Sequence, residues 1–232
     1  MAVGELLTIS FADTERGIQG VAIDGAGSLL KLGEEPAISG PPLFERDGNA
    51  VNVRAGDAWE LRLEPLAPAA MTVIQEIWLH RATGTAGSAR FDGLALLRRA
   101  SGDRGGVAVE RSLAILFDAG LAFALGARRP AGARGHGDEL LEAVAFRGDP
   151  AAPATFERPL LSSTYDAGGD LAHVGMELWE TEESDRPTRI GGEAQSHGVV
   201  AHPGGASTHV TFVAWHHDGR HGLGSYAITT PA

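Results

Sequence analysis

The chain of 232 residues contains no cysteine. This absence excludes disulfide bonds, thiolate nucleophiles and cysteine-ligated zinc sites. Lysine is almost absent as well, since Lys31 is the only lysine among 19 basic residues. We therefore expect no reaction that proceeds through a Schiff-base lysine.

Long apolar runs are also missing. No stretch reaches the roughly 18 uninterrupted apolar residues that a transmembrane helix needs. The N-terminal sequence MAVGELLTISFADTERG has no basic segment followed by an apolar run of about 7–15 residues, which is the pattern of a signal peptide. These absences predict a cytoplasmic protein.

Positive charge is scarce relative to negative charge, because the formal net charge is -11 and the pI is about 5.2. A nucleic-acid partner needs a basic face, and an anionic membrane repels an acidic protein. We therefore expect no nucleic-acid partner and no stable membrane insertion. The sequence carries no signal for an oligomeric state.

Glycine is abundant, with 32 residues that separate short alternating runs. Asp-Gly turns recur at 24–25, 47–48, 92–93 and 218–219, a pattern typical of antiparallel β-structure. The segment from Pro68 to Arg81 has some helical spacing, but its β-branched residues and the lack of a helix cap favour a strand. A short helix is predicted from Gly137 to Ala145. The fold class is therefore all-β.

A weak internal repeat appears when Met71 is placed on Met176, a shift of 105 residues. Two hairpin-like segments, Leu113 to Leu125 and Val210 to Leu223, continue the likeness. We infer two tandem β-rich halves, residues 1–130 and 131–232, which meet at the Pro- and Gly-rich segment 129–137.

Two stretches of the chain resemble a known family. They are LAILFDAGLAFALGARRPAGARGHGDELLEAVAF and MELWETEESDRPTRIGGEAQSHGVV. They are similar to lipocalin-like proteins grouped with hydroxyneurosporene synthase (carotenoid hydratase). The resemblance implies two tandem lipocalin-like antiparallel β-barrel or sandwich halves. It also implies an apolar cavity in which some relatives hydrate or cyclise isoprenoid or polyketide-type molecules.

The stretch AWHHDGRHGLGSY near the C-terminus predicts a hairpin around the Asp218-Gly219 turn. Alternation places Trp215, His217 and Tyr226 on one face. Glycines opposite Trp215 leave free volume beside the indole, where an apolar ligand could bind. The predicted cross-strand pairs are His217 with Arg220, His216 with His221, Trp215 with Gly222, Val213 with Gly224, and Thr211 with Tyr226.

A metal site is not expected at this hairpin. The adjacent His216 and His217 point to opposite faces, and no third ligand follows at a suitable spacing. The sequence also lacks a phosphate-binding glycine loop and a nucleophile elbow. We therefore expect neither a metal nor a cofactor.

Acid–base chemistry on an alkene needs one group that protonates carbon and another that accepts a proton from water. The candidate catalytic residues are His217, Asp166 and Glu177. The candidate ligand-binding residues are Trp215, Tyr226, Trp179 and Tyr165. Each has a structural alternative: Asp166 could cap a turn, and Glu177 could lie on a solvent-exposed face.

The segment from His136 to Glu139 allows two interpretations. Its histidine and two carboxylates could form an acid–base site, or the acidic residues could stabilise a helix N-terminus, and the second interpretation is favoured.

The resemblance, taken with these patterns, implies a protein that binds a hydrophobic, isoprenoid- or polyketide-like small molecule. It would transform that molecule by cofactor-free hydration, cyclisation or isomerisation, as a lyase or an isomerase. The alternatives are a carrier that does not react with its ligand and a structural or interaction module.

Overall fold

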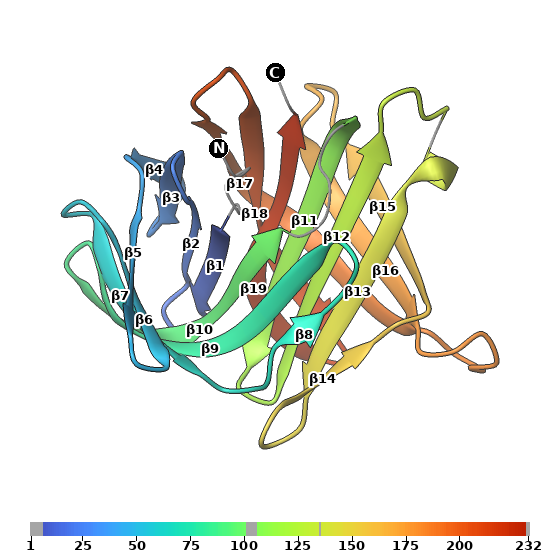
Figure 1. Cartoon of the computed structure of the whole chain (residues 1–232), viewed down its shortest axis with the longest axis horizontal. Helices are drawn as coiled ribbons and strands as arrows, with labels where there is room; N and C mark the ends of the chain where they lie inside the picture. Colours follow the sequence, from blue (N-terminus) through green and yellow to red (C-terminus); the bar gives the residue numbers. More distant parts are fainter. Residues whose placement is uncertain (1–6, 101–105, 135, 231–232) are drawn as a thin grey trace.

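The computed structural model of the chain describes residues 7–100, 106–134 and 136–230, with the side chain of residue 136 left out. It consists of two curled antiparallel sheets (Figure 1). Within the described residues the one helical element is the 3-10 turn η1 (His136–Asp138), and the all-β prediction is confirmed. None of the described helices is long and apolar enough to cross a membrane.

The first sheet, which we call the N-terminal half, has the strand order β4-β3-β2-β1-β10-β9-β7-β6-β5, and β8 pairs with β9. Its strands are β1 (Leu7–Asp13), β2 (Ile18–Ile23), β3 (Gly27–Lys31), β4 (Pro36–Ser39), β5 (Leu43–Asp47), β6 (Ala50–Ala55), β7 (Trp59–Pro65), β8 (Ala70–Met71), β9 (Gln75–Ala86) and β10 (Ala89–Ala100).

The second sheet, the C-terminal half, has the order β14-β13-β12-β11-β19-β18-β17-β16-β15. Its strands are β11 (Val107–Asp118), β12 (Leu121–Pro130), β13 (Leu140–Arg147), β14 (Ala152–Thr155), β15 (Arg158–Tyr165), β16 (Leu171–Trp179), β17 (Thr188–Ala201), β18 (Ser207–His217) and β19 (Arg220–Thr230).

The two halves repeat one plan. In each, the first strand lies at the centre beside the last strand. The other strands follow outward in chain order on the side of the first strand and in reverse order on the side of the last. Each sheet curls into a half-barrel, which confirms two tandem lipocalin-like halves.

The alternation of buried apolar and exposed charged side chains along the strands gives each half-barrel an apolar inner face. Strand β7, with the sequence WELRLEP, buries Trp59, Leu61 and Leu63 and exposes the charged residues between them. This period of two is the pattern of a strand with one apolar and one solvated face. The buried side chains join Phe11 and Phe91 in the core of the N-terminal half.

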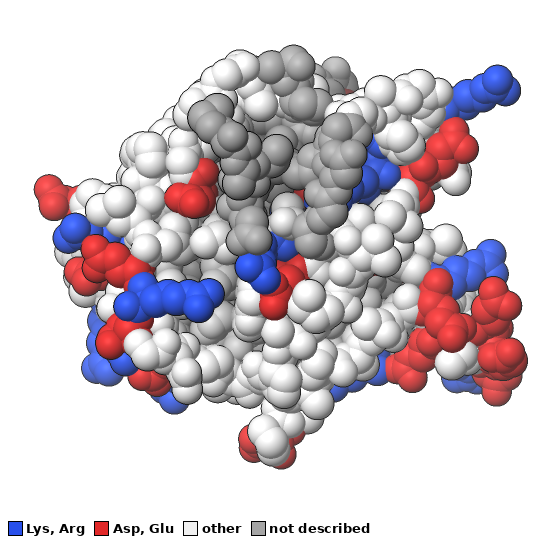
Figure 2. Space-filling view, viewed as in Figure 1, with Lys and Arg blue, Asp and Glu red and all other residues white. Residues whose placement is uncertain are grey.

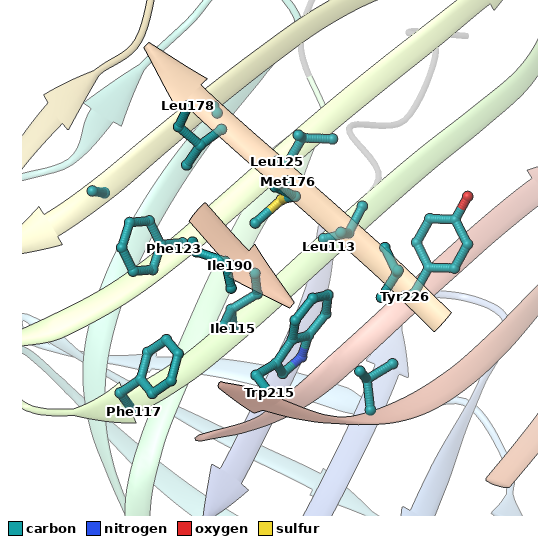
Figure 3. Packing of buried hydrophobic residues seen from close by; sticks show 14 of the residues in the cluster. Leu113, Ile115, Phe117, Phe123, Leu125, Met176, Leu178, Ile190, Trp215 and Tyr226 are labelled. Atoms are coloured by element: carbon teal, nitrogen blue, oxygen red, sulfur yellow. The ribbon is translucent and has the colours of Figure 1, made fainter. Parts of the chain in front are cut away.

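The core of the C-terminal half surrounds Trp215. Figure 3 shows its indole among aliphatic side chains such as Ile115 and Ile190, with Phe117 and Phe123 to one side. The ring of Tyr226 lies at the margin of the group, and its hydroxyl points away from the other labelled side chains.

The outer faces of the two half-barrels pack against each other through a second set of buried residues, including Leu79 and Leu96 from one half and Leu116 and Phe146 from the other. Polar contacts also cross this boundary. The Ser10 and Ser225 hydroxyls lie 3.0 Å apart, and Glu142 accepts hydrogen bonds from the backbone N–H groups of residues 73 and 74 at 2.9 and 3.0 Å.

The sheets divide between Ala100 and Val107, which is earlier in the chain than the predicted boundary at residue 130. The segment 129–137 instead leads from β12 to β13 within the second sheet. Pro130 ends β12, and Gly132 lies in the turn that follows it. Proline and glycine favour such a turn between paired strands as well as a linker between domains.

The repeat also differs in detail from the predicted alignment. Met71 lies in β8 and Met176 in β16, and these strands do not occupy equivalent places in the two sheet orders. By strand order, β9 corresponds to β18 and β16 to β6. The alignment therefore pairs strands that have a similar sequence pattern but occupy different positions in the two sheets.

Two local predictions have opposite outcomes. The segment from Gln75 to Arg81 is part of strand β9, as expected. The helix predicted from Gly137 to Ala145 is wrong, because residues from Leu140 onward pair with β12 as β13. Long-range strand pairing overrides the local helix signal at Asp138.

Candidate functional site

A cavity of about 450 Å³ opens into the interior of the N-terminal half. Its volume lies within the range of roughly 300–1,000 Å³ that is usual for small-molecule sites. The walls are mainly apolar. The lining residues are Leu7, Phe44, Arg46, Gly48, Asn49, Ala50, Val51, Pro65, Trp78, His80, Leu97 and Arg99.

Strand register explains which side chains reach the cavity. On β9, alternation places Trp78 and His80 on the same face, and on β10 it does the same for Leu97 and Arg99. Leu97 lies opposite Trp78, and Arg99 lies opposite Glu76. The four lining residues of these two strands therefore form one side of the cavity.

His80 is the polar residue that lies deepest in this wall. It is 3% exposed, and its Nδ1 has no hydrogen-bond partner among the described residues. Burial lowers the pKa of His80 to about 4, against a small opposing effect of a hydrogen bond with the Trp78 backbone. At neutral pH the imidazole is uncharged and can accept or donate one hydrogen bond in the cavity.

Two arginines also line the cavity, and no aspartate or glutamate does so among the described residues. Arg99 forms an ion pair with Glu76, and its guanidinium carbon lies 5.7 Å from the centre of the Trp78 ring. Arg46 lies on β5 opposite Val51. Glu76 thus balances the charge of Arg99, and Arg46 supplies a positive charge that no acidic lining residue among those described balances.

A second cleft, of about 330 Å³, lies between the halves and has the opposite charge. Its lining includes the carboxylates of Asp13, Glu15, Asp92 and Asp118 with a single basic residue, Arg81. Asp13 is held by Arg16 at 2.8 Å, and Arg81 pairs with Asp92. These ion pairs account for much of the charge in the cleft.

The outer surface reflects the net acidity of the chain. Figure 2 shows charged side chains gathered at the flanks of one face, with broad uncharged areas between them. The acidic group at the right edge lies over the β16–β17 connection, where Glu182, Glu183 and Asp185 are exposed. Neither feature forms a concave site.

The predicted hairpin is confirmed in every cross-strand pair, from Thr211 with Tyr226 to His217 with Arg220. The predicted free volume beside Trp215 is not present. A Cβ at Gly192 would lie 2.6 Å from Cε3 of Trp215, and one at Gly224 would lie 3.1 Å from its Nε1. The indole itself fills the space that the glycines leave, and both Trp215 and Tyr226 are 1% exposed.

His217 is placed by packing and by one hydrogen bond. Its ring centre lies 5.6 Å from that of Phe123 and 6.1 Å from that of Phe117. Its Nδ1 lies 2.9 Å from the carbonyl oxygen of Arg189, to which it can donate. His217 does not line the cavity described above.

The other predicted catalytic residues occupy structural positions at the surface. Asp166 accepts hydrogen bonds from the backbone N–H groups of Gly168 and Asp170 at 2.8 and 3.0 Å, so it caps a turn. Glu177 pairs with Arg189 at 2.9 Å, and both side chains are largely exposed.

The predicted aromatic residues are only partly brought together. The phenols of Tyr165 and Tyr226 are neighbours, and Tyr165 is 49% exposed. Burial raises the pKa of Tyr226, while a hydrogen bond from Arg111 at 3.4 Å acts to lower it. Trp179 is half-buried at the end of β16 and stands apart from the core around Trp215.

The segment from His136 to Glu139 contains the 3-10 turn η1 (His136–Asp138), with Asp138 in its first turn. The carboxylate of Glu139 is 1% exposed and lies in ion pairs with Arg111 and Arg129. Asp138 accepts a hydrogen bond from the backbone of Arg134 at 2.8 Å. The side chain of His136 lies outside the described residues. Glu139 thus neutralises two arginines at the end of the C-terminal half.

No group of three or more histidine, aspartate or glutamate side chains suited to a metal ion occurs among residues 7–100, 106–134 and 137–230. Sequence reasoning missed His80, Trp78 and the two cavity arginines. The available signal was the alternation in QEIWLH, which places Trp78 and His80 on one face of a strand.

No family model and no curated protein sequence matches the chain. Solved structures do match over nearly its full length. CghA with Sch210972 has a TM-score of 0.61 at 10% identity, covering 98% of this chain and 89% of that one. CghA in another structure has a TM-score of 0.65 at 9% identity, covering 98% and 88%. A protein of Nitrosomonas europaea designated an AttH has a TM-score of 0.62 at 12% identity, covering 97% and 91%. At these identities the likeness shows the shared fold.

Proposed function

We propose that the chain binds a hydrophobic small molecule inside its N-terminal half. The observation that carries this proposal is the cavity of about 450 Å³, with mainly apolar walls and a few inward polar groups. An apolar ligand gains free energy by leaving water for such a wall, and Trp78 offers it a large flat surface. The CghA structure with Sch210972 supports this function, since it shares the fold.

The class of ligand that we propose is isoprenoid- or polyketide-like. The resemblance to proteins related to carotenoid hydratase supports this choice. A location in the cytoplasm, the lack of a cofactor and the lack of a nucleic-acid partner stay predictions of the sequence.

The experiment combines ligand recovery with a variant that fills the cavity. Native mass spectrometry of the freshly purified chain, followed by extraction, identifies a bound compound. Binding of the neutral dye Nile red is then measured for Val51→Trp, which places an indole in the cavity. The matched control is Val199→Trp, at a position that is 42% exposed in the other half.

We expect Val51→Trp to weaken dye binding at least about 10-fold and Val199→Trp to leave it unchanged. The proposal fails if neither the native chain nor the control binds the dye. It also fails if the two tryptophan variants bind the dye equally well while both remain folded.

A second candidate function, catalysis of hydration, cyclisation or isomerisation, is favoured by His80. A buried neutral imidazole in an apolar cavity can accept a proton from water or from a substrate. His80 therefore takes the role of base for which His217, Asp166 and Glu177 were candidates. Chromatography coupled to mass spectrometry, followed over time, separates the functions. A carrier returns its extracted ligand unchanged, a hydratase adds the mass of one water, and a cyclase or isomerase changes the retention time at constant mass.

A further inference from the structure

Three features of the cavity indicate which chemical groups its ligand carries, which the cavity volume alone does not. They are the positive charge at Arg46 and Arg99, the apolar section at Trp78 and Leu97, and the unpaired nitrogen of His80. A hydrophobic molecule without polar groups would satisfy only the second feature. The inference that follows rests on the proposed function.

The two arginines differ in the contacts that they make within the protein. Arg99 contacts Glu76 and Trp78 within the protein. Arg46 is exposed and has no hydrogen bond or ion pair with any described residue. A guanidinium on the wall of an apolar cavity that lacks acidic lining residues attracts an anion, and a carboxylate matches its geometry.

His80 lies further into the half-barrel along the same strand. Arg99 pairs across the ladder with Glu76, and His80 lies four residues beyond Glu76 on β9, with Trp78 between them. Four residues of strand span about 13 Å. The buried Nδ1 of His80 needs a hydrogen-bond partner, because an unsatisfied buried polar atom costs free energy.

We propose that the cavity selects an amphipathic hydroxy acid. Its carboxylate would bind beside Arg46 and Arg99, its apolar section would lie along Trp78 and Leu97, and its distal hydroxyl would hydrogen-bond to His80. A hydroxyl suits either tautomer of a neutral imidazole, because it can both donate and accept.

The test compares three probes that share one saturated chain. Dodecan-1-ol carries a hydroxyl alone, dodecanoic acid carries a carboxylate alone, and ω-hydroxydodecanoic acid carries both at opposite ends. Binding to the native chain is measured by isothermal titration calorimetry. We expect the acid to bind about 10-fold more tightly than the alcohol, and the hydroxy acid to bind more tightly than either.

Arg46→Gln should abolish the preference for the acid over the alcohol. The matched control is Arg54→Gln, because Arg54 is exposed on β6 and pairs with Leu43 at the other end of the same β5–β6 ladder. This control removes the same charge outside the cavity, and its preference should stay as in the native chain. An equal loss in both variants would overturn the carboxylate assignment, since net charge alone would then explain it.

His80→Leu should remove the gain from the distal hydroxyl and leave the preference for the acid intact. His80→Gln keeps a hydrogen-bonding side chain and should restore part of that gain. If His80 served only in packing, the two variants would not differ in the affinity that the distal hydroxyl adds.

The outcomes distinguish the inference from the function on which it rests. If Nile red and the alcohol bind but the acid binds no more tightly, the selectivity inference fails and the proposed function stands. If the hydroxy acid gains nothing over dodecanoic acid, the role of His80 fails. If neither the dye nor any of the probes binds, both proposals fail.

Discussion

In the C-terminal half, strands β18 and β19 turn Trp215 and Tyr226 inward, and both side chains are 1% exposed. In the N-terminal half, the corresponding strands β9 and β10 turn Trp78, His80 and Arg99 towards a cavity of about 450 Å³. The strand order is the same, so the difference arises from the side chains and from the lengths of equivalent strands, such as β7 and β17. One half has a packed core, whereas the other combines a core with a cavity that has mainly apolar walls and a few polar side chains.

Buried polar atoms without a hydrogen-bond partner among the described residues occur in both halves, among them Nε1 of Trp215 and Oγ of Ser196 in the C-terminal half. In the C-terminal half, the carboxylate of Glu139 is matched by two arginines. In the N-terminal half, Nδ1 of His80 has no partner among the described residues. Proteins tend to keep such an unsatisfied group where function requires it. Of these atoms, Nδ1 of His80 belongs to a residue that lines the cavity of the N-terminal half. We therefore place the proposed ligand in that half.

The strongest test of this comparison is the same substitution in both halves. Trp215→Ala should lower the free energy of unfolding by about 3–5 kcal/mol, because it empties a well-packed core. Trp78→Ala should cost only about 1 kcal/mol, because Trp78 is half-buried and borders a space that water can enter. Urea denaturation measures both values, and equal costs would contradict the division.

The pH dependence of stability tests whether His80 in the N-terminal half is buried in its neutral form. The pKa of His80 is about 4 in the fold against an ordinary value of 6.5, so the unfolded chain binds the proton more tightly. Stability should therefore be complete above pH 6.5 and should fall as the pH is lowered towards 4, by on the order of 3 kcal/mol. Denaturation of His80→Leu in the same buffers should lack this contribution. A variant curve parallel to that of the native chain would refute it.

His217→Ala examines the histidine that sequence reasoning favoured. The substitution removes ring contacts with Phe117 and Phe123 and one hydrogen bond, which should cost about 1–2 kcal/mol of stability. Binding of Nile red should not change. If the variant folds but no longer binds Nile red, the ligand site lies in the C-terminal half instead.

The smallest expected effect is that of His80→Leu on stability at pH 7. Replacing an unsatisfied buried imidazole by an apolar side chain of similar size should raise the free energy of unfolding by about 1 kcal/mol. A thermal melt of the ligand-free chain measures this gain. A marked loss of stability would mean that His80 holds a structural contact.

Sequence reasoning succeeded where a local pattern controls the structure. The Asp218-Gly219 turn determines the register of β18 with β19, and each predicted pair is present. The strand at Gln75 to Arg81 followed from alternation and β-branching. The helix predicted near Asp138 failed because the pairing of β13 with β12 depends on residues far from that local signal.

The location of the site could not be obtained in the same way. Alternation shows that Trp78 and Trp215 each lie on one face of a strand, but it does not show how much volume the opposing strands supply. Gly222 and Gly224 suggested space beside Trp215, yet the ring of Phe117, the backbone of β11 and the indole itself occupy that space. Whether a half-barrel is filled or hollow depends on the sum of side chains from all its strands, which no local pattern reports.

We propose above that the ligand binds in the N-terminal half. A crystal structure of the chain with bound ω-hydroxydodecanoic acid tests it most directly. We predict density along Trp78 and Leu97, with one polar end near Arg46 and the other within hydrogen-bond distance of His80. Density beside Trp215 and Tyr226 in the C-terminal half, with the N-terminal cavity empty, would contradict the account.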